Sequence, residues 1–433
     1  MCWYRDWAGG VPVNVMDEIL DRLVDLSDYT RFAAVCVAWR NLALDDRNRN
    51  HYHKVRCTSS TTQIPMLMLG GSGSGLFSNG GGVAEFYSVT RRKVLNNFRL
   101  PSPYHTDLRI IGSAFGWLIN ISKSDFPNVE VILSNPFLDS TIRIPSISSY
   151  SDFEQFNDYR HIVKATLSKD PALYPDEYVV LMIYGEEGKL AFLKPGDVGA
   201  GGRWRKLVFG GGFCDVIYSN SRGLFLGVIA TTGKVCSIDV AGEEVVIDYI
   251  TPALRFRERA DKDNQRYIVE TPSGDVLQVY RSSSGCEAEA IRTLKIKVFE
   301  FNETTICWCE MKSSLGNLAL FVGCGSSLCV RASDFRGCRP GSVYYSFPYR
   351  IYSWIRYRYY SKLMSNGQPF DGDWRCYDVG VVDINTQRRE SLRLKRYPSD
   401  WFDMMDASIH TFPIWVIPTF QHQKRRPREE EED

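Results

Sequence analysis

The chain has 433 residues, of which 44% are hydrophobic and 13% aromatic, and its formal net charge is +1. This length allows one small and one large domain, and the balanced charge excludes a general attraction to nucleic acid or to a membrane surface. No stretch reaches the ~18 apolar residues of a transmembrane helix, and the first ten residues lack the apolar core of a signal peptide. We therefore expect the twelve cysteines to be free thiols in a reducing compartment, the cytoplasm, the nucleus or both.

Residues 11–43 carry an amphipathic helical pattern. Pro12 suits the start of a first helix, and Asn14 is a favourable residue for its N-cap. Apolar residues then recur every four positions, at Val15, Ile19 and Leu23. A second stripe, predicted to lie on one face of a further helix, contains Phe32, Val35, Cys36 and Trp39. About forty residues make a marginal core, so we expect the rest of the chain or another protein to cover part of this surface.

This stretch resembles an F-box. The similarity rests on Val11-Pro12, on Glu18-Ile19-Leu20 with Leu23, and on Arg31-Phe32 followed by Val35-Cys36 and Trp39-Arg40. Valine at position 11, where the family usually has leucine, is a mild departure. The resemblance implies a helical module that binds the Skp-type adaptor of a cullin-based ubiquitin ligase. The adaptor-binding residues that it implies are Val11, Pro12, Ile19, Leu20, Leu23, Phe32, Val35, Cys36, Trp39 and Arg40. Some of them must instead hold the helices together, and Trp39 is a candidate for either role.

A glycine-rich segment, residues 70–82, follows the apolar run 64–69. Glycine is costly in helices and strands, so we interpret the segment as a hairpin tip. A phosphate-binding loop would need a Gly-Lys-Ser/Thr ending, and no lysine occurs before Lys93.

From residue 83 onward, short apolar strands alternate with turn residues. Examples of hairpins are VAEFYSV with VLNNFRL around TRRK, and YIVE with DVLQVY around Pro-Ser-Gly. This spacing predicts a mostly β architecture, in which a β-propeller of about six blades hides most sheet edges. A pair of β-sandwiches is the structural alternative. The predicted organisation is a helical domain over residues 7–48, a linker over 49–63, a propeller over 64–420 and a charged, disordered tail over 421–433.

Several short motifs of the β-rich region resemble the kelch-like propeller of the KIB type, found in a large family of plant F-box proteins. They include GSAFGWLI (112–119), LSNPF (133–137), DVIYSN (215–220) and PIWVIP (413–418), and they occur in order. In a propeller the last strand must pair with the first blade, and FPIWVIPTF (412–420) is the candidate for this closure. The basic run KRRPR (424–428) also permits a weak nuclear-import signal, although acidic residues follow it directly.

No combination of residues predicts an enzyme, a metal site or a cofactor. The closest cysteine pairs are Cys307 with Cys309 and Cys324 with Cys329, which we expect to be buried thiols because no second zinc-binding motif lies near them. The six histidines are scattered, and no spacing indicates a catalytic triad or paired glycosidase carboxylates.

The run SFPYRIYSWIRYRYYSK (346–362) combines aromatic residues with arginine, the residue types that dominate binding hot spots. Strand alternation would place one set on a common face, as a possible substrate surface: Arg350, Tyr352, Trp354, Arg356, Arg358 and Tyr360. An ordinary blade strand with aromatic residues between sheets is the alternative, and stacking on single-stranded nucleic acid is a weaker one.

Taken with the resemblance, these features predict a non-catalytic substrate receptor of an SCF-type ubiquitin ligase. Its partners would be a Skp-type adaptor, through it the cullin and RING subunits, and an unknown protein substrate, with neither nucleic acid nor membrane. The alternative is a propeller scaffold whose F-box no longer engages a ligase.

Overall fold

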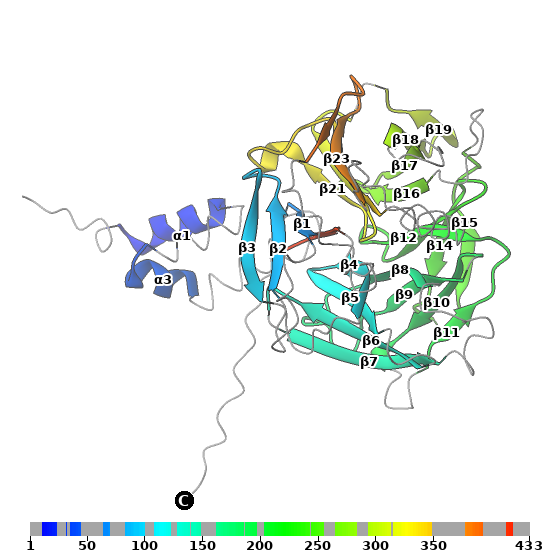
Figure 1. Cartoon of the computed structure of the whole chain (residues 1–433), viewed down its shortest axis with the longest axis horizontal. Helices are drawn as coiled ribbons and strands as arrows, with labels where there is room; N and C mark the ends of the chain where they lie inside the picture. The colour runs from blue at the N-terminus through cyan, green and yellow to red at the C-terminus, as the bar shows by residue number, and fades with distance from the viewer. Residues whose placement is uncertain are drawn as a thin grey trace, which may run out of the picture.

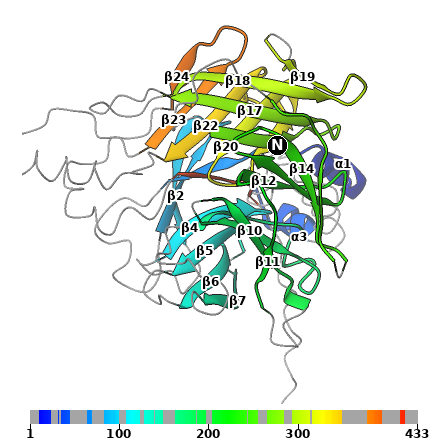
Figure 2. The same cartoon turned by 90° about the vertical axis from the view of Figure 1, so that its right-hand side faces the viewer.

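The structure is a computed structural model. It describes residues 11–23, 32, 35–44, 64–69, 83–99, 108–122, 128–138, 140–148, 162–185, 187–196, 203–242, 244–254, 265–283, 293–312, 315–348, 377–392 and 413–418. The strands in these ranges form six sheets arranged around a common axis, which makes the architecture a six-bladed β-propeller (Figures 1 and 2). The prediction of about six blades is confirmed, and the alternative of two sandwiches is wrong.

The first three blades take up the first half of the ring, and the strands of each are given from one edge of its sheet to the other. Blade 1 contains β25 (Ile414–Val416), β1 (Met66–Leu69), β2 (Val83–Ser88) and β3 (Lys93–Arg99). Blade 2 contains β4 (Leu108–Ala114), β5 (Trp117–Ser122), β6 (Asn128–Asn135) and β7 (Ser140–Ser148). Blade 3 contains β8 (Ile162–Leu167), β9 (Val180–Tyr184), β10 (Lys189–Leu193) and β11 (Arg205–Leu207).

The remaining three blades complete the ring. Blade 4 contains β12 (Phe213–Ser219), β13 (Leu224–Ile229), β14 (Val235–Asp239) and β15 (Val246–Tyr249). Blade 5 contains β16 (Gln265–Glu270), β17 (Val276–Ser283), β18 (Thr293–Asn302) and β19 (Cys307–Glu310). Blade 6 contains β21 (Leu328–Arg331), β20 (Leu318–Gly323), β22 (Ser342–Pro348), β23 (Tyr377–Asp383) and β24 (Arg389–Ser391), with the short 3-10 helix η3 (Ala332–Asp334) after β21.

Strand β25 closes the ring as predicted. It pairs antiparallel with β1, with Trp415 opposite Leu67, so the first blade is built from both ends of the propeller sequence. The glycine-rich segment 70–82 lies outside the described residues. The strands on either side of it pair antiparallel, with Met66 opposite Ser88.

Blade 6 departs from the expected series of antiparallel hairpins. After β20 the chain turns back to form β21, and then β22 pairs with β20 on the other side in parallel, with Ala319 opposite Ser342. Strand β21 therefore sits at the edge of a five-stranded sheet. The sequence did not predict the extra strand β21 or the parallel pairing of β20 with β22. Hydrophobic periodicity identifies strands, but it does not show which strands are neighbours in a sheet.

The cores lie between neighbouring blades. One cluster joins blades 2 and 3 and includes Trp117, Met182 and Trp204. Gly112 of β4 shows how closely these blades approach, because a Cβ at this position would overlap the carbonyl group of Ala165 in β8. Sheet-on-sheet burial of alternating apolar residues thus explains why so many short strands stay together.

The helices α1 (Val13–Arg22) and α3 (Val37–Leu44) lie to one side of the ring, next to β2 and β3 (Figure 1). Helix α1 begins one residue before the predicted cap. Pro12, rather than Asn14, is its N-cap residue, and the Pro12 carbonyl accepts the N–H groups of Val15 and Met16. The proline ring fixes φ near −60°, and proline has no N–H group that the start of the helix would leave unpaired, which suits this position.

The predicted single stripe from Phe32 to Trp39 is wrong, because the helix is interrupted within it. Val35 and Cys36 lie in a bend before α3. The Sγ atom of Cys36 accepts the backbone N–H of Trp39 at 3.4 Å, so this cysteine caps α3. A thiol is not a usual capping group, which explains why the sequence pattern did not indicate the break.

Candidate functional site

The N-terminal helices have a small core of their own. Met16, Leu20, Phe32 and Ala43 are buried together, and Trp39 packs against them with its ring stacked on Phe32 at a centroid distance of 4.5 Å. Two of the residues predicted to bind an adaptor, Leu20 and Phe32, are therefore core residues of the helical module.

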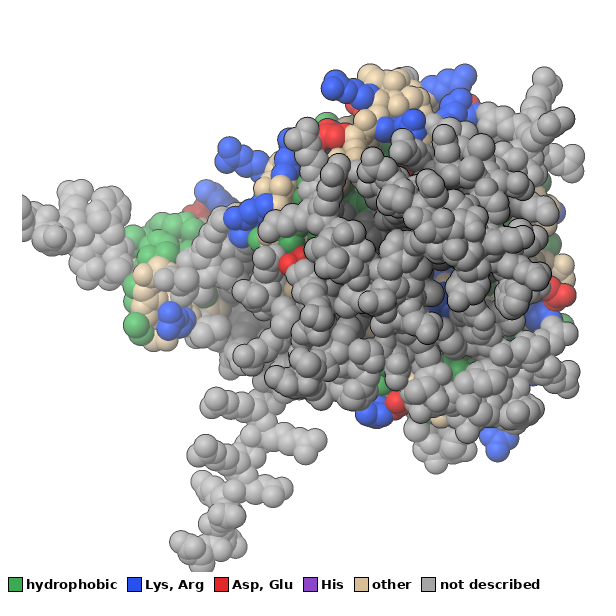
Figure 3. All heavy atoms as spheres, in the orientation of Figure 1, with side chains coloured by type: hydrophobic (Ala, Val, Ile, Leu, Met, Phe, Trp, Pro, Cys, Tyr) green, Lys and Arg blue, Asp and Glu red, His purple; other side chains and the backbone are tan. Residues whose placement is uncertain are grey.

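Other apolar side chains of the same module point outward. Val13, Val15, Ile19, Val35 and Val37 are exposed to 63%, 40%, 37%, 57% and 68%. They make up five of the eleven exposed large hydrophobic residues among all the described residues. Figure 3 shows this as apolar surface gathered over the helices, at the left of the molecule. Such a concentration on so short a segment is typical of an interaction surface.

The remaining predicted dock residues surround this surface. Pro12 and Arg40 are exposed, whereas Val11, Leu23, Cys36 and Trp39 are half-buried. Val13, Val15 and Val37 were not predicted to belong to the dock, although all three lie in the first turn of a helix. The sequence located the module but did not separate its core side chains from its outward ones.

The predicted substrate surface at Arg350, Tyr352, Trp354, Arg356, Arg358 and Tyr360 lies outside the described residues, as do all six histidines and the charged tail. Only the start of the aromatic run is described. There Phe347 is fully buried in β22, stacked against Tyr345 and Tyr267.

The expectation of buried thiols is wrong for Cys307 and Cys309. Both are exposed on β19, the edge strand of blade 5, and their Sγ atoms lie 3.8 Å apart on one face. Trp308 between them faces the protein and donates its Nε1–H to the Pro252 carbonyl at 3.0 Å. Strand alternation therefore directs the two thiols to solvent. Cys329 is buried and Cys324 half-buried. Within the described ranges, His, Cys, Asp and Glu form no group of three or more that could hold a metal ion.

A second candidate site lies on the propeller axis, where a turn of blade 6 crosses the ring. We call residues 324–327, which connect β20 to β21, the axial turn. The Ser326 N–H donates to the Ser113 carbonyl of blade 2 at 3.1 Å, and its hydroxyl lies 2.8 Å from that of Thr166 in blade 3. Gly325 approaches Ser113 and Trp415 so closely that a side chain would not fit. The turn thus joins three other blades at the axis.

A buried ion pair lies beside the axial turn. The Lys164 ammonium of blade 3 binds the Asp215 carboxylate of blade 4, which also accepts the Ile268 N–H of blade 5 at 2.9 Å and the Ser327 hydroxyl at 3.3 Å. Burial raises the pKa of Asp215, and the positive charge and hydrogen bonds of Lys164 act against this shift. Four blades therefore meet at one carboxylate.

A pocket with a cavity volume of about 370 Å³ lies against the axial turn. Its walls come from all six blades, mainly from the ends of the strands nearest the axis and the turns that follow them. Hydroxyl groups are abundant in it: Ser113, Thr166, Ser221, Thr271, Ser273, Ser326 and Ser327. Apolar side chains such as Leu167, Ile217 and Ile417 lie between them. A mixed lining of this kind, at this size, is typical of ligand sites.

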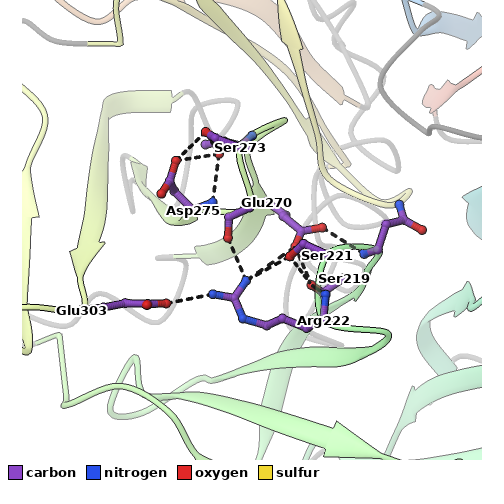
Figure 4. A network of polar contacts seen from close by, with 10 residues as sticks. Ser219, Ser221, Arg222, Glu270, Ser273, Asp275 and Glu303 are labelled. Atoms are coloured by element: carbon purple, nitrogen blue, oxygen red, sulfur yellow. Dashed lines mark hydrogen bonds and ion pairs between the residues drawn. The ribbon is translucent and has the colours of Figure 1, made fainter.

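Glu270 is the one Asp or Glu residue in the described lining. Its side chain is only 12% exposed, and it accepts the hydroxyls of Ser219 and Ser221 and the Asn220 N–H, the last at 3.0 Å (Figure 4). Arg222 lies 3.5 Å from Glu270 and also binds Glu303 at 2.9 Å. These contacts tie the turn after β12 to the end of β16 and fix the carboxylate at the pocket wall.

Comparison with known proteins places this architecture in a family. The model of the KIB1-4 beta-propeller matches residues 86–383, which is most of the chain. The chain belongs to the KIB1-4 β-propeller family. This match and the F-box names of similar Arabidopsis thaliana proteins confirm the resemblance to plant F-box proteins with a KIB-type propeller.

Two of these relatives come from Arabidopsis thaliana. At5g55150, named as an F-box protein, is 22% identical over 78% of this chain and 84% of its own length. F-box protein At2g26160 is 26% identical over 78% of this chain and 95% of its own. Among solved structures, a protein from Lactobacillus plantarum matches 57% of this chain and 66% of its own, with 12% identity and a TM-score of 0.34, and nothing is inferred from so remote a likeness.

The axial pocket of this KIB-type propeller was not predicted from the sequence. Its residues come from segments up to 304 positions apart, from Ser113 to Ile417, and Ser113, Thr166 and Ser326 look like ordinary strand and turn residues. Among the described residues, no helix is both long and apolar enough to cross a membrane.

Proposed function

We propose that this protein is the substrate-recognition subunit of an SCF-type E3 ubiquitin ligase. The helical module would bind the Skp-type adaptor and, through it, the cullin and RING subunits, while the propeller holds the protein to be ubiquitinated. The chain performs no covalent step in this role. It raises the local concentration of the substrate near a ubiquitin-loaded enzyme held elsewhere in the complex.

The exposure of Val13, Val15, Ile19, Val35 and Val37 on a module with its own core carries this proposal. A surface of this kind is costly to leave in water, at ~25 cal/mol for each Å² of apolar area. Among the described residues, none from the propeller belongs to the core cluster of the helices, so we expect another protein to cover the exposed face. The F-box names of the relatives support a Skp-type adaptor as that protein. The protein that carries these helices would act in the cytoplasm, the nucleus or both.

The test is adaptor binding by variants that alter the outward face alone. Ile19→Asp and Val37→Asp place a charge on the exposed surface, and we expect each to weaken adaptor binding roughly tenfold or more. Val246→Asp is the matched control, because Val246 is 52% exposed on the propeller and should leave binding unchanged. Leu20→Asp is unsuitable, since it would disrupt the helical core. Binding can be measured by calorimetry with purified adaptor.

Two outcomes would change the proposal. Normal binding by both Ile19→Asp and Val37→Asp would show that the dock lies elsewhere on the chain. Failure of the wild-type protein to bind any Skp-type adaptor would instead favour a propeller scaffold that does not act in a ligase.

A further inference from the structure

We infer that the axial pocket is where the propeller takes its substrate, and that it accepts a short unphosphorylated peptide segment with a neutral or cationic side chain at its centre. This inference rests on the proposed function for the role of the bound peptide. The binding chemistry itself rests on the pocket.

The shape of the site supports a peptide segment. The axial turn crosses the ring and contacts Ser113, Thr166 and Asp215, so this end of the axis is a pocket closed by protein rather than an open channel. A volume of about 370 Å³ is within the range of small-ligand sites, enough for a few side chains. Since all six blades contribute to its walls, the pocket exists only in the assembled propeller.

The polar groups of the lining favour hydrogen bonds with a peptide backbone and with hydroxyl or amide side chains. Hydroxyls of Ser221, Thr271 and Ser273 line the same side of the pocket as Glu270. The Ser221 and Ser273 hydroxyls already donate to Glu270 and Asp275, so their oxygens would act as acceptors for the N–H groups of a bound segment. The apolar residues between them, Leu167, Ile217 and Ile417, would cover aliphatic parts of the same ligand.

The charges of the described lining disfavour an anionic ligand. The described lining contains Glu270 but neither lysine nor arginine. Arg222, the cation nearest in the Glu270 network, is bound to Glu303 and to the Gly274 carbonyl, the latter at 2.7 Å. Asp275 adds a further carboxylate to the turn beside it, where it accepts the Ser273 hydroxyl (Figure 4). Glu270 lines the pocket, Asp275 and Glu303 lie beside it, and Arg222 offsets only part of their charge, so a phosphate or a carboxylate bound here would meet repulsion and lose its hydration.

A cation is favoured by the same arrangement. Among the described residues, the Oε2 atom of Glu270 accepts one hydrogen bond, from the Asn220 N–H, and a carboxylate oxygen can accept two. A lysine or arginine side chain from the substrate would supply the second. The rigidity of Glu270, held by two serine hydroxyls and a backbone amide, would orient this contact without further ordering of the protein.

The experiment uses the full chain purified in complex with its Skp-type adaptor. The probe is an array of nine-residue peptides of random sequence, printed in matched sets that differ only in the central residue: lysine, glutamine, serine, phosphoserine or glutamate. In each peptide set that binds, we expect a strong signal from the peptides with lysine, glutamine or serine at the centre. The peptides of the same set with phosphoserine or glutamate should give a binding signal at least tenfold lower.

Three variants connect the signal to the pocket. Ser221→Trp adds a bulky side chain at the exposed pocket rim and should lower the signal at least tenfold. Thr231→Trp, in the exposed turn between β13 and β14 of the same blade, is the matched control and should behave like the wild type. Glu270→Gln should remove the preference for lysine over glutamine. Melting temperatures close to that of the wild type would show that each variant is folded.

The outcomes separate this inference from the proposed function. Preference for phosphoserine, absence of any binding set, or full binding by Ser221→Trp would overturn the assignment of the pocket. Adaptor binding is measured on the same samples, so a chain that binds peptides in its pocket but no adaptor would contradict the ligase role alone.

Discussion

Lys164 and Asp215 form an ion pair in which both side chains are almost completely buried, at 5% and 0% exposure. The pair connects β8 to β12, and Asp215 continues the connection to β16 and to the axial turn. A charge removed from water to this extent is stable only while its partner and hydrogen bonds stay in place.

The first prediction concerns this pair. Asp215→Asn leaves the Lys164 ammonium buried without a counter-charge and should lower the free energy of unfolding by about 3–5 kcal/mol. Glu177→Gln breaks the exposed pair with Lys169 and should cost less than about 1 kcal/mol. Urea unfolding of both variants provides the comparison. If Asp215→Asn and Glu177→Gln have the same free energy of unfolding, the buried pair of Lys164 and Asp215 does not stabilise the propeller as predicted.

The second prediction concerns ring closure. Trp415 is 1% exposed, and its ring lies 5.1 Å from that of Phe321 and 6.3 Å from that of Tyr344 in blade 6. Trp415→Ala should therefore cost about 3–5 kcal/mol of stability. Trp415→Phe should cost less, about 1.5 kcal/mol or below, because the Nε1 atom of Trp415 has no hydrogen-bond partner among the described residues.

Truncation gives an independent test of the same closure. A chain ending after residue 411 lacks β25 and leaves the edge of β1 unpaired, so we expect aggregation in size-exclusion chromatography. A chain ending after residue 420 keeps β25 and should elute as the full-length protein does. Identical elution of both would contradict closure by β25.

The third prediction concerns the contact between blades 2 and 3. Gly112→Ala places a methyl group against the Ala165 carbonyl, and separating the two strands should cost about 1–3 kcal/mol. Gly210→Ala is the control, because a Cβ there meets no other atom within 4 Å. Thermal unfolding should show a lower midpoint for Gly112→Ala alone.

The fourth prediction concerns thiol reactivity. Burial raises the pKa of Cys236 and of Cys329 to about 12, whereas Cys307 and Cys309 are exposed. Because the thiolate is the reactive form, iodoacetamide near neutral pH should modify the exposed pair first. Within the pair Cys307 should react faster, since its hydrogen bond raises the pKa of the Cys309 thiol.

Peptide mass spectrometry over a time course would measure these rates. The unfolded protein serves as the control, since all of its cysteines should then react at similar rates. Rapid modification of Cys236 in the folded protein would contradict the burial on which the prediction is based.

The features that the sequence predicted well are those with a local signal. The hairpin of β16 and β17 follows from Pro272-Ser273-Gly274 between two apolar runs, and Gly274 indeed adopts a positive φ of 93°. Closure by Ile414–Val416 follows from an isolated apolar segment near the end of the chain. Both depend on periodicity and turn chemistry, which a single sequence records.

The features that it missed depend on distant contacts. The cap of α3 by Cys36 uses a residue type with weak capping preference. The inserted β21 and the axial turn depend on partners such as Ser113 and Trp415, which are far away in the sequence. For the same reason, no local sequence pattern indicated that Glu270 and the other residues of the axial pocket come together. The sequence pattern located the helices that carry the exposed face. It did not show that Leu20 and Phe32 pack inside the helical core, which only the structure shows.

The pairing of β25 with β1 also sets an order of events during synthesis. Met66 and Val416 are partners in the completed blade, yet 350 residues separate them along the chain. At roughly 5–20 residues per second, the ribosome needs about 20–70 s to make this interval. Throughout that time the helices already exist, whereas the first blade has a bare edge and the axial pocket is incomplete. Under the proposed function, we therefore expect the helices to meet their adaptor before the propeller is able to hold a substrate.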